Sequence, residues 1–280
     1  MDETTRALIR LALNEDVGTG DVATDATVPV DQRTTGRIIV KEYGVFCGGR
    51  LVEPVFRELD NGVDVELLVG DGERVRAGTL AARVTGQSRA ILTGERLVLN
   101  FLQRLSGVAT TAARYVEAVE GTGVTLLDTR KTTPGMRLLE KEAVAAGGGA
   151  NHRMGLFDMA LIKDNHIVAA GGIAEAVASV RASADGVAVE VEVVDLEGLE
   201  EAIAAGAERV MLDNMERDEM AEAIRVARAS SPALEVEVSG GVTLESIRAI
   251  AELGPDYISV GALTHSAGSL DISLELGEDA

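Results

Sequence analysis

The fold is decided by four stretches in the second half of the chain: VAVEVEVVD (187–195), RVMLD (209–213), LEVEVS (234–239) and YISVG (257–261). Each is a short, largely apolar run that reaches a polar residue or a glycine near its end, and Ala-rich helical segments lie between them. Two earlier runs, TLLDTRK (125–131) and MALIK (159–163), end in the same way. Strands that alternate with helices indicate a parallel α/β sheet, and barrel active sites lie at the carboxyl ends of such strands. The sequence therefore predicts an α/β barrel with its site at those ends.

Strand alternation predicts which side chains face the barrel interior. Successive strand residues point to opposite sides, so Glu190 and Glu192 share one face while the neighbouring valines share the other. Glu235 and Glu237 alternate with valine in the same way. If the valines pack against outer helices, the carboxylates face inward. Buried carboxylates are strongly disfavoured alone, so cations or a wet polar site must accompany them.

Cations are concentrated close to the first predicted strand ends. The chain has only four lysines, and three of them lie between residues 131 and 163. Arg130, Lys131 and Lys163 stand at strand ends and are expected to bind a ligand. His152 and Arg153 follow the Gly-rich segment AAGGGAN and are also expected to face a ligand.

Two further cations of this window have a different interpretation. Arg137 and Lys141 lie in MRLLEKEAVAAG (136–147), which has a helical pattern. Charged residues on such a segment are usually solvated, so both are predicted to lie on a helix surface.

The last two strand ends predict a phosphate site. SGGVT (239–243) and VGALTH (260–265) each place glycine after a strand and a hydroxyl residue near an expected helix start. Glycine lets the backbone approach an anion, and a helix N-terminus offers free N–H groups. Barrels commonly bind phosphate at the loops that follow these strands.

The chain changes character near residue 107. Before it, segments 33–49 and 63–86 alternate apolar and polar residues between Gly-rich turns, which predicts a small antiparallel sheet. Residues 90–120 form a long helical stretch that Gly94 and Ser106-Gly107 are expected to interrupt. The tail SLDISLELGED (269–279) is predicted to return as a strand to this first module.

One hairpin in the first module suggests an alternative function. VGDGERVRAGTLAARV (69–84) resembles the hairpin of biotinyl and lipoyl carrier domains. Those carriers need a lysine on a tight hairpin, and no lysine occurs between Lys41 and Lys131. A carrier function is therefore not supported.

Charge excludes several kinds of partner. With 26 Lys+Arg against 46 Asp+Glu, the formal net charge is −20, which repels nucleic acid and anionic membranes. The acidic, lysine-poor composition with 2% aromatics indicates adaptation to a saline (halophilic) cytoplasm.

The single Cys47 fits a reducing compartment. No apolar run is long enough to span a membrane, and no signal peptide is recognisable, so a cytoplasmic location is expected.

A set of motifs in order resembles one known family. The motifs are EDVGTGDVAT (15–24), GERLVLNFLQRLSGVAT (94–110), DTRKTTPGMR (128–137), GGGANHRMGLFDMALIKDNH (147–166), VEVEV (189–193), MLDN (211–214), SGGV (239–242) and VGALTHS (260–266). They recur in this order in quinolinate phosphoribosyltransferase, also called nicotinate-nucleotide pyrophosphorylase (carboxylating). The resemblance covers essentially the whole chain.

The resemblance implies a fold and an activity. The fold is α/β: an incomplete seven-stranded α/β barrel (108–267) plus an N-terminal α/β sandwich domain (1–107, joined by the tail 268–280). The activity is transfer of the phosphoribosyl group of 5-phosphoribosyl-1-pyrophosphate to quinolinate, with release of pyrophosphate and CO2, in de novo NAD biosynthesis. Mg²⁺ is the implied cofactor. A homodimer or hexamer is implied, with Arg96 donated across the interface.

The resemblance also implies roles for the site residues. Lys163, Glu192, Asp213 and Lys131 are expected to be catalytic, and Glu192 and Asp213 to hold ribose hydroxyls or magnesium. The expected substrate-binding residues are Arg96, Thr129, Arg130, Lys131, His152, Arg153, Lys163, Glu192, Asp213, Ser239, Gly240, Gly241, Gly261, Ala262 and His265.

Two other activities remain open at this level. The first is that of a related molybdenum-transport-associated protein with a similar transferase fold; intact DTRKT, NHR and KDNH segments favour quinolinate. The second is a Schiff-base aldolase that uses Lys163 or Lys131, which borohydride trapping would reveal.

Overall fold

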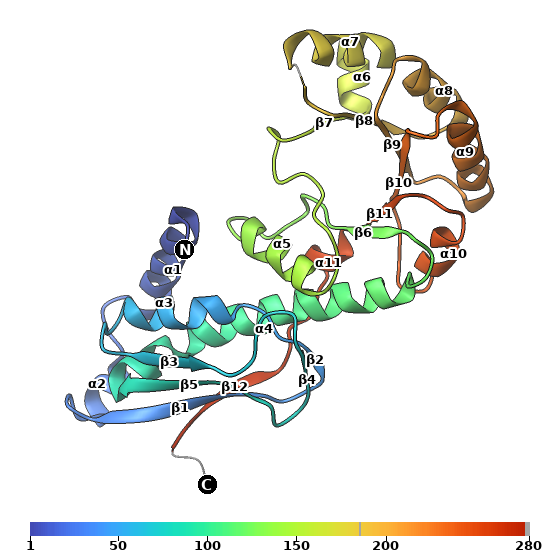
Figure 1. Cartoon of the computed structure of the whole chain (residues 1–280). Helices are drawn as coiled ribbons and strands as arrows, with labels where there is room; N and C mark the ends of the chain where they lie inside the picture. The colour runs from blue at the N-terminus through green and yellow to red at the C-terminus, as the bar shows by residue number, and fades with distance from the viewer. Residues whose placement is uncertain (185, 278–280) are drawn as a thin grey trace. The chain divides into compact units, whose positions relative to one another are not determined.

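The computed structural model describes residues 1–184 and 186–277 and divides into two compact units (Figure 1). The first comprises Met1–Ala113, Thr132–Gly148 and Ser266–Ala280, and the second comprises Arg114–Lys131 and Gly149–His265. The segment Thr132–Gly148, which the domain prediction placed in the barrel, groups with the first unit. Among the described residues, no helix is both long enough and apolar enough to cross a membrane.

An antiparallel sheet forms the centre of the first unit. Its strand order is β12 (Ile272–Leu276), β1 (Arg33–Val40), β5 (Leu80–Gln87) and β3 (Asp64–Leu67). The pairing of β12 with β1 confirms that the tail returns to this module. The remaining elements of the unit are α1 (Glu3–Val17), α2 (Val22–Thr27), β2 (Gly44–Val45), η1 (Gly49–Leu51), α3 (Val52–Arg57), β4 (Arg74–Val75) and α5 (Arg137–Ala146).

The long helix α4 (Ser88–Ala118) is continuous, and the predicted interruptions are wrong. Its glycines serve close packing instead. A Cβ at Gly94 would lie 2.9 Å from the ring of Phe56 on α3, and one at Gly107 would lie 1.9 Å from the carbonyl oxygen of Gly268. The Ser106 hydroxyl accepts a hydrogen bond from the Cys47 N–H at 2.9 Å, so it also belongs to a packed contact. Close contacts with other elements of the first unit, rather than local helix propensity, explain why these small residues stand in the helix.

Parallel strands form the sheet of the second unit. They run in the order β6 (Thr125–Leu127), β11 (Tyr257–Ser259), β10 (Glu235–Ser239), β9 (Arg209–Asp213), β8 (Val189–Val193) and β7 (Ala160–Ile162). Beyond β6, Ala150 makes a parallel bridge to Leu127, so the seventh expected strand is reduced to one bridged residue. The barrel is therefore incomplete, as predicted.

Helices cover the outer face of this sheet (Figure 1). They are α6 (Asp164–Ala170), α7 (Ile173–Ser183), α8 (Leu196–Ala204), α9 (Arg217–Ser230) and α10 (Ile247–Ala251). The short helix α11 (Ala262–His265) lies instead beside Lys131, after the end of β11. Val189, Val191, Val236 and Val238 are fully buried. Burying a valine contributes roughly 1.5–3 kcal/mol, so the outward-facing valines hold the sheet to its helices and direct the glutamates inward.

Lys141 corrects one sequence prediction. It was expected on a solvated helix surface, but on α5 of the first unit it is 0% exposed. Its neighbour Glu140 is equally buried and accepts hydrogen bonds from Arg104 at 2.7 and 3.0 Å. The helical pattern located α5 correctly, but it did not reveal that both charged residues point into the unit.

Candidate active site

A cavity of about 350 Å³ lies at the carboxyl ends of the barrel strands. Its lining comes entirely from the second unit: Thr129, Arg130, Lys131, His152, Arg153, Leu161, Lys163, Glu192, Met211, Asp213, Asn214, Ser239, Gly240, Gly241 and Ser259. Eleven of these are residues that the sequence predicted for the site. The position at the strand ends is the one expected for a barrel enzyme.

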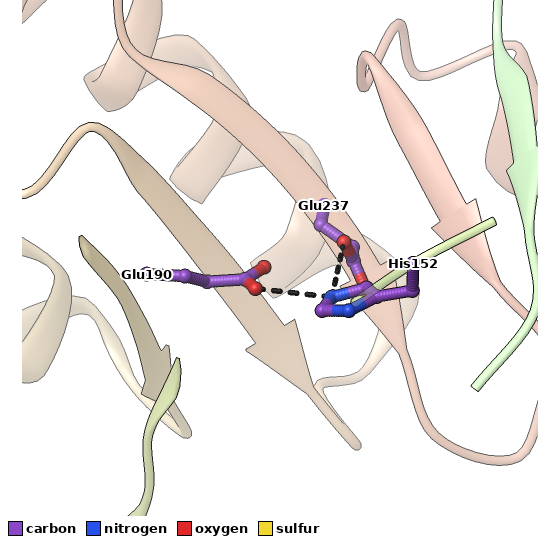
Figure 2. Close-up of side chains that lie close together, drawn as sticks. All are labelled: His152, Glu190 and Glu237. Carbon is purple, nitrogen blue, oxygen red and sulfur yellow. Dashed lines mark hydrogen bonds and ion pairs between the residues drawn. The ribbon is translucent and has the colours of Figure 1, made fainter. Parts of the chain in front are cut away.

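A buried histidine and two glutamates form the cluster that we call the floor of the site: His152, Glu190 and Glu237 (Figure 2). His152 Nε2 lies 3.0 Å from a carboxylate oxygen of Glu190 and 3.4 Å from one of Glu237. Both glutamate side chains are 0% exposed. The inward direction predicted for these carboxylates is thus confirmed, and His152 is the polar side chain that lies between them.

Local backbone contacts fix the position of His152. Ala150 bridges the end of β6, and two residues later the His152 N–H donates to the carboxylate of Asp128 at 2.9 Å. Asp128 is itself fully buried just after β6. The Arg153 N–H donates to His152 Nδ1 at 2.7 Å. Since Nδ1 accepts a hydrogen bond, the ring is the tautomer that carries its proton on Nε2 and donates it to Glu190.

The floor binds a proton more tightly than its separate groups would in water. Burial lowers the pKa of His152, but the hydrogen bond to Glu190 and the negative charges of Glu190 and Glu237 outweigh this effect and raise the value to about 9. Burial, aided by the charge of Glu237, raises the pKa of Glu190 to about 7. Full protonation of the ring would break the Arg153 N–H bond to Nδ1, so geometry favours holding the additional proton on the carboxylate pair.

The same three residues have the composition of a metal site, but their hydrogen bonds oppose that role. Their donor atoms all lie within 4.8 Å of one another. A metal-bound histidine normally donates its other ring N–H to an acceptor. In His152 the other nitrogen, Nδ1, accepts a bond from Arg153 N–H, which places the proton on Nε2, the atom that would have to ligate. The arrangement therefore fits a hydrogen-bonded cluster.

A second group of charges lies closer to solvent, and we call it the mouth: Arg130, Arg153, Lys163 and Glu192. Lys163 caps the start of α6, directly after β7, and its ammonium group pairs with the Glu192 carboxylate on β8. The Lys163 N–H donates to His166 Nδ1 at 3.0 Å, which fixes the chain at this turn. The Lys163 side chain is 42% exposed and that of Glu192 is 12% exposed. Charges with this exposure can exchange partners with a ligand.

Arg130 and Arg153 place two guanidinium groups near each other beside the cavity. Burial lowers the pKa of Arg153, and the charge of Arg130 lowers it further. The Arg153 side chain is anchored by a hydrogen bond to the Met159 carbonyl at 3.2 Å. Like charges held together in this way favour an anion between them, because arginine binds carboxylates through paired hydrogen bonds.

Paired glycines form the part of the cavity at the end of β10. Gly240 has φ +91° and Gly241 has φ +61°, conformations that favour glycine. A Cβ at Gly240 would also lie 2.4 Å from the Asn214 side chain. No helix begins directly after these glycines, since α10 starts only at Ile247. The expected helix start holds only for the last strand end, where α11 follows Gly261.

Gly261, Ala262 and His265 do not line the cavity themselves. They adjoin it through Lys131: a Cβ at Gly261 would lie 3.0 Å from Lys131 Cδ and 3.1 Å from His265 Nε2. The Thr264 hydroxyl donates to the Lys131 carbonyl at 2.8 Å. Arg96, the remaining predicted residue, is exposed on α4 in the first unit.

Asp128 and Arg209 were not predicted as site residues. Asp128 precedes the predicted Thr129 and holds the His152 backbone. Arg209 lies at the start of β9, with Nη1 3.6 Å from Glu237. A signal for Arg209 exists in the sequence: in RVMLD it shares a strand face with Met211 and Asp213. It is the inward cation that the glutamates require.

Fold and cavity together define an α/β-barrel enzyme whose site is built for small anionic substrates. Comparison with known proteins then gives the family. A family model for the quinolinate phosphoribosyl transferase C-terminal domain matches residues 108–275, and one for the N-terminal domain matches residues 21–106. The chain belongs to the quinolinate phosphoribosyltransferase family, as its motifs indicated.

Individual relatives agree over nearly the full chain. A nicotinate-nucleotide pyrophosphorylase (carboxylating) of Mycobacterium leprae is 42% identical, with 98% of each chain covered. A probable one of Bacillus subtilis is 44% identical over 94% of this chain and 90% of its own. The solved nicotinate-nucleotide pyrophosphorylase of Francisella tularensis is 42% identical with a TM-score of 0.93, covering 98% of this chain and 96% of its own. These matches favour neither the molybdenum-associated protein nor the aldolase.

Proposed function

We propose that this protein transfers the phosphoribosyl group of 5-phosphoribosyl-1-pyrophosphate to the ring nitrogen of quinolinate, with loss of CO2, giving nicotinate mononucleotide and pyrophosphate. The observation that carries the proposal is a cavity lined by four lysine and arginine side chains and two carboxylates in a protein of net charge −20. Family membership supports the same reaction. Quinolinate and the phosphoribosyl donor are both strongly anionic, which this cation-lined cavity suits.

Quinolinate would bind at the side of the cavity formed by Arg130, Arg153 and Lys163. Its two carboxylates need at least two cationic groups, and the neighbouring guanidinium groups lose their mutual repulsion when an anion lies between them. His152 lines the cavity beside these three cations, and its hydrogen bond from the Arg153 N–H connects them to the floor. The backbone of Arg153 is held by His152, so the orientation of this arginine is prepared before the substrate arrives.

The phosphoribosyl donor would bind along the opposite side. Ser239, Gly240 and Gly241 offer a hydroxyl and exposed backbone for the 5-phosphate, with Gly261, Ala262 and His265 next to them. Lys131 and Thr129 would meet the pyrophosphate. Glu192 and Asp213 would hold the ribose hydroxyls.

Glu192 and Asp213 also suit magnesium, because both present carboxylate oxygens to the cavity and oxygens are the ligands that Mg²⁺ prefers. When bound there, the ion would supply charge neutralisation for the pyrophosphate. The protein groups act on the sugar and the ring. As the bond from the anomeric carbon to pyrophosphate breaks, positive charge grows on that carbon, and the carboxylates of Glu192 and Asp213 stabilise it.

The quinolinate nitrogen then forms the new bond to the anomeric carbon and becomes cationic. Its adjacent carboxylate leaves as CO2, and the electron pair of the broken carbon–carbon bond stays on the ring as an ylid, which takes up a proton. The cations that bind quinolinate stabilise this electron-rich carbon. Lys163 is the group best placed for this role, since its ammonium enters the cavity from the mouth.

The proposed reaction is tested by pyrophosphate release from 5-phosphoribosyl-1-pyrophosphate with quinolinate, and in parallel with nicotinate. Turnover with quinolinate alone is expected, because two cationic groups await two carboxylates. Turnover with nicotinate alone, or with neither acceptor, would overturn the proposal. Borohydride treatment with a carbonyl substrate provides the control for an aldolase.

Arg96 is proposed to complete the site of a neighbouring subunit in a homodimer or larger assembly. It is an exposed arginine on α4 and belongs to the first unit. Two inactive variants, Arg96→Ala and Lys163→Ala, would then damage different halves of a shared site. Mixed heterodimers should regain one intact site and measurable activity. Heterodimers that form without any activity would show that Arg96 acts in its own chain or that the dimer model is wrong.

A further inference from the structure

A chain of charged and polar side chains continues from the floor of the site toward the amino-terminal ends of the barrel strands. It begins at His152, passes through Glu237 to Arg209, and ends at Glu235 and Tyr257. Arg209 and Glu235 are register partners at the starts of β9 and β10, and Glu190 is the partner of Arg209 on β8. Side chains far from the cavity mouth are thus connected to a residue that lines the cavity.

Arg209 is held by three contacts. Its Nε and Nη2 atoms donate to the same Glu235 oxygen at 2.9 and 2.7 Å. Its guanidinium carbon lies 4.1 Å from the centre of the Tyr257 ring, and the Tyr257 hydroxyl donates to the other Glu235 oxygen at 3.0 Å. A guanidinium fixed by a carboxylate and an aromatic face keeps few alternative orientations. The remaining Nη1 atom therefore points to Glu237 from a fixed position.

In the described part of the chain, Glu237 interacts with opposite charges only through Arg209 and His152. The residue is 0% exposed, neither of its carboxylate oxygens has a hydrogen bond, and the opposite charges near it are Arg209 Nη1 at 3.6 Å and His152 Nε2 at 3.4 Å. A buried carboxylate without hydrogen bonds is destabilising by itself. Glu237 lies beside His152 (Figure 2) and faces the anchored Arg209 on its other side, which indicates that it positions the histidine.

The fixed orientation of the His152 ring in turn fixes the backbone of Arg153, a cation of the mouth. His152 Nε2 faces Glu190 and Glu237, and its Nδ1 accepts the Arg153 N–H at 2.7 Å. If the ring rotated, the Arg153 amide would lose its acceptor, and the guanidinium that lines the cavity would lose its fixed base. Errors of about 1 Å in such a group can reduce activity by two orders of magnitude.

We propose that Arg209 and Glu237 are positioning residues, which act through His152 to set the orientation of Arg153 for binding of the dicarboxylate acceptor. The proposal rests on the proposed function for the identity of that acceptor. It predicts a split between the two substrates: the KM for quinolinate depends on the network, whereas the KM for 5-phosphoribosyl-1-pyrophosphate does not. In the described part of the chain, the hydrogen bonds and ion pairs of Arg209 go to Glu235 and Glu237 and not to Ser239, Gly240 or Gly241 on the phosphate side.

The test compares Arg209→Met, which keeps the length of the side chain and removes its charge, with Arg209→Lys, which keeps the charge. Arg181→Met is the matched control, because Arg181 pairs with Glu208 at the surface and contacts neither Glu237 nor His152. For Arg209→Met we expect the KM for quinolinate to rise about tenfold, the equivalent of one lost charge-assisted contact, with the other KM unchanged. Arg209→Lys should recover most of the loss, and Arg181→Met should match the wild type.

A spectroscopic readout makes the test independent of turnover. The chain has only three histidines, so their ¹⁵N signals can be assigned with His166→Gln and His265→Gln variants. The wild type should show His152 with its proton on Nε2, and Arg209→Met should give a mixture of tautomers. If the wild type does not use quinolinate, the proposed function fails, while the His152 signals still test the network.

Two results would overturn the positioning role. One is folded Arg209→Met protein with the wild-type KM for quinolinate and unchanged His152 signals. The other concerns folding: if Arg209→Met unfolds, Glu237→Gln replaces it, because glutamine keeps the shape of the side chain and removes the buried charge. Loss of folding in both variants would show a purely structural network and would reject the proposal.

Discussion

The mouth and the floor of the cavity use similar residues in different surroundings. At the mouth, Lys163 pairs with Glu192 while 42% of the lysine side chain remains exposed. On the floor, His152 pairs with Glu190 and Glu237, and these side chains are 6%, 0% and 0% exposed. Water screens the first pair, so its attraction is weak and a ligand can replace either partner. The second lies in a medium of low polarity, where breaking a pair leaves an uncompensated charge.

The comparison separates two ways of contributing to activity. Mouth residues can be removed with little effect on folding, because solvent replaces their lost contacts. Floor residues determine both the stability of the barrel and the orientation of the groups above them. Mutations should therefore divide into those that reduce activity alone and those that also reduce the free energy of unfolding.

The largest effect is expected for Lys163→Ala at the mouth. Turnover should fall by roughly two to four orders of magnitude, as for the loss of a charged group that acts in the transition state, while the unfolding temperature should change little. Lys41→Ala is the matched control, since Lys41 is a similarly exposed lysine that pairs with Glu275 on the sheet of the first unit. Steady-state kinetics and thermal unfolding on the same samples decide the matter. A Lys163→Ala enzyme with near-normal turnover would contradict its assigned role.

The floor should respond in stability as well as in activity. His152→Leu removes the polar side chain that lies between two buried carboxylates, so the free energy of unfolding should fall by about 3 kcal/mol, as when one partner of a buried pair is removed. Urea denaturation monitored by circular dichroism measures this. Arg153→Ala, at the mouth, should lose activity but remain within about 1 kcal/mol of the wild type. Equal stability losses in the two variants would remove the distinction between mouth and floor.

A pH effect on stability should also originate on the floor. The pKa of His152 is raised from 6.5 to about 9 by the two carboxylates with which the ring shares this proton, so the folded floor holds the proton more tightly than the unfolded chain does. This stabilisation is complete below about pH 6.5 and is lost as the pH rises through about 9. The free energy of unfolding should decrease across that interval by roughly 1–3 kcal/mol. Glu237→Gln removes one carboxylate that holds the proton, so the decrease should become smaller. A wild-type stability that is flat or rising between pH 6.5 and 9 would contradict the assignment.

The smallest effect is expected from salt and concerns neither the mouth nor the floor specifically. At a net charge of −20, repulsion between surface carboxylates acts over about 30 Å at 0.01 M ionic strength and about 3 Å at 1 M. Dialysis from high into low salt should therefore lower the unfolding temperature by a few degrees. His152→Leu should show the same salt dependence as the wild type, since buried pairs are little screened. An unchanged midpoint would count against the saline-adaptation hypothesis.

Strand positions and strand faces could be read directly from the sequence. The alternation of glutamate with valine identified Glu190 and Glu237 as inward-facing before any contact was known, because the two faces of a strand are fixed by its geometry. The glycines of α4 led to a wrong prediction of helix breaks, because their role depends on contacts with residues distant in the sequence. Taken from the sequence alone, Gly107 indicates a helix break. In the fold, its missing side chain leaves room for the carbonyl group of Gly268, which is more than a hundred residues away in the sequence.

Charged residues on helices were the least predictable. Lys141 and the solvated lysine of an ordinary amphipathic helix have the same local pattern, and only the tertiary structure shows that Lys141 is buried. Arg209 was overlooked for a related reason: its importance lies in Glu237, Glu235 and Tyr257, which come from two other strands. Proximity between strands depends on the order of the sheet, and no local pattern specifies that order.

By itself, the sequence determined the class of fold, the end of the barrel that carries the site, and most of the residues that line the cavity, because strand periodicity and strand ends are local properties of the chain. The tertiary structure alone decided which charges are partners. It placed His152 between two buried glutamates, put Glu192 against Lys163, and connected Arg209 to the floor. Pairing energies depend on distance and on burial in a medium of low polarity, and both quantities exist only once the strands have assembled.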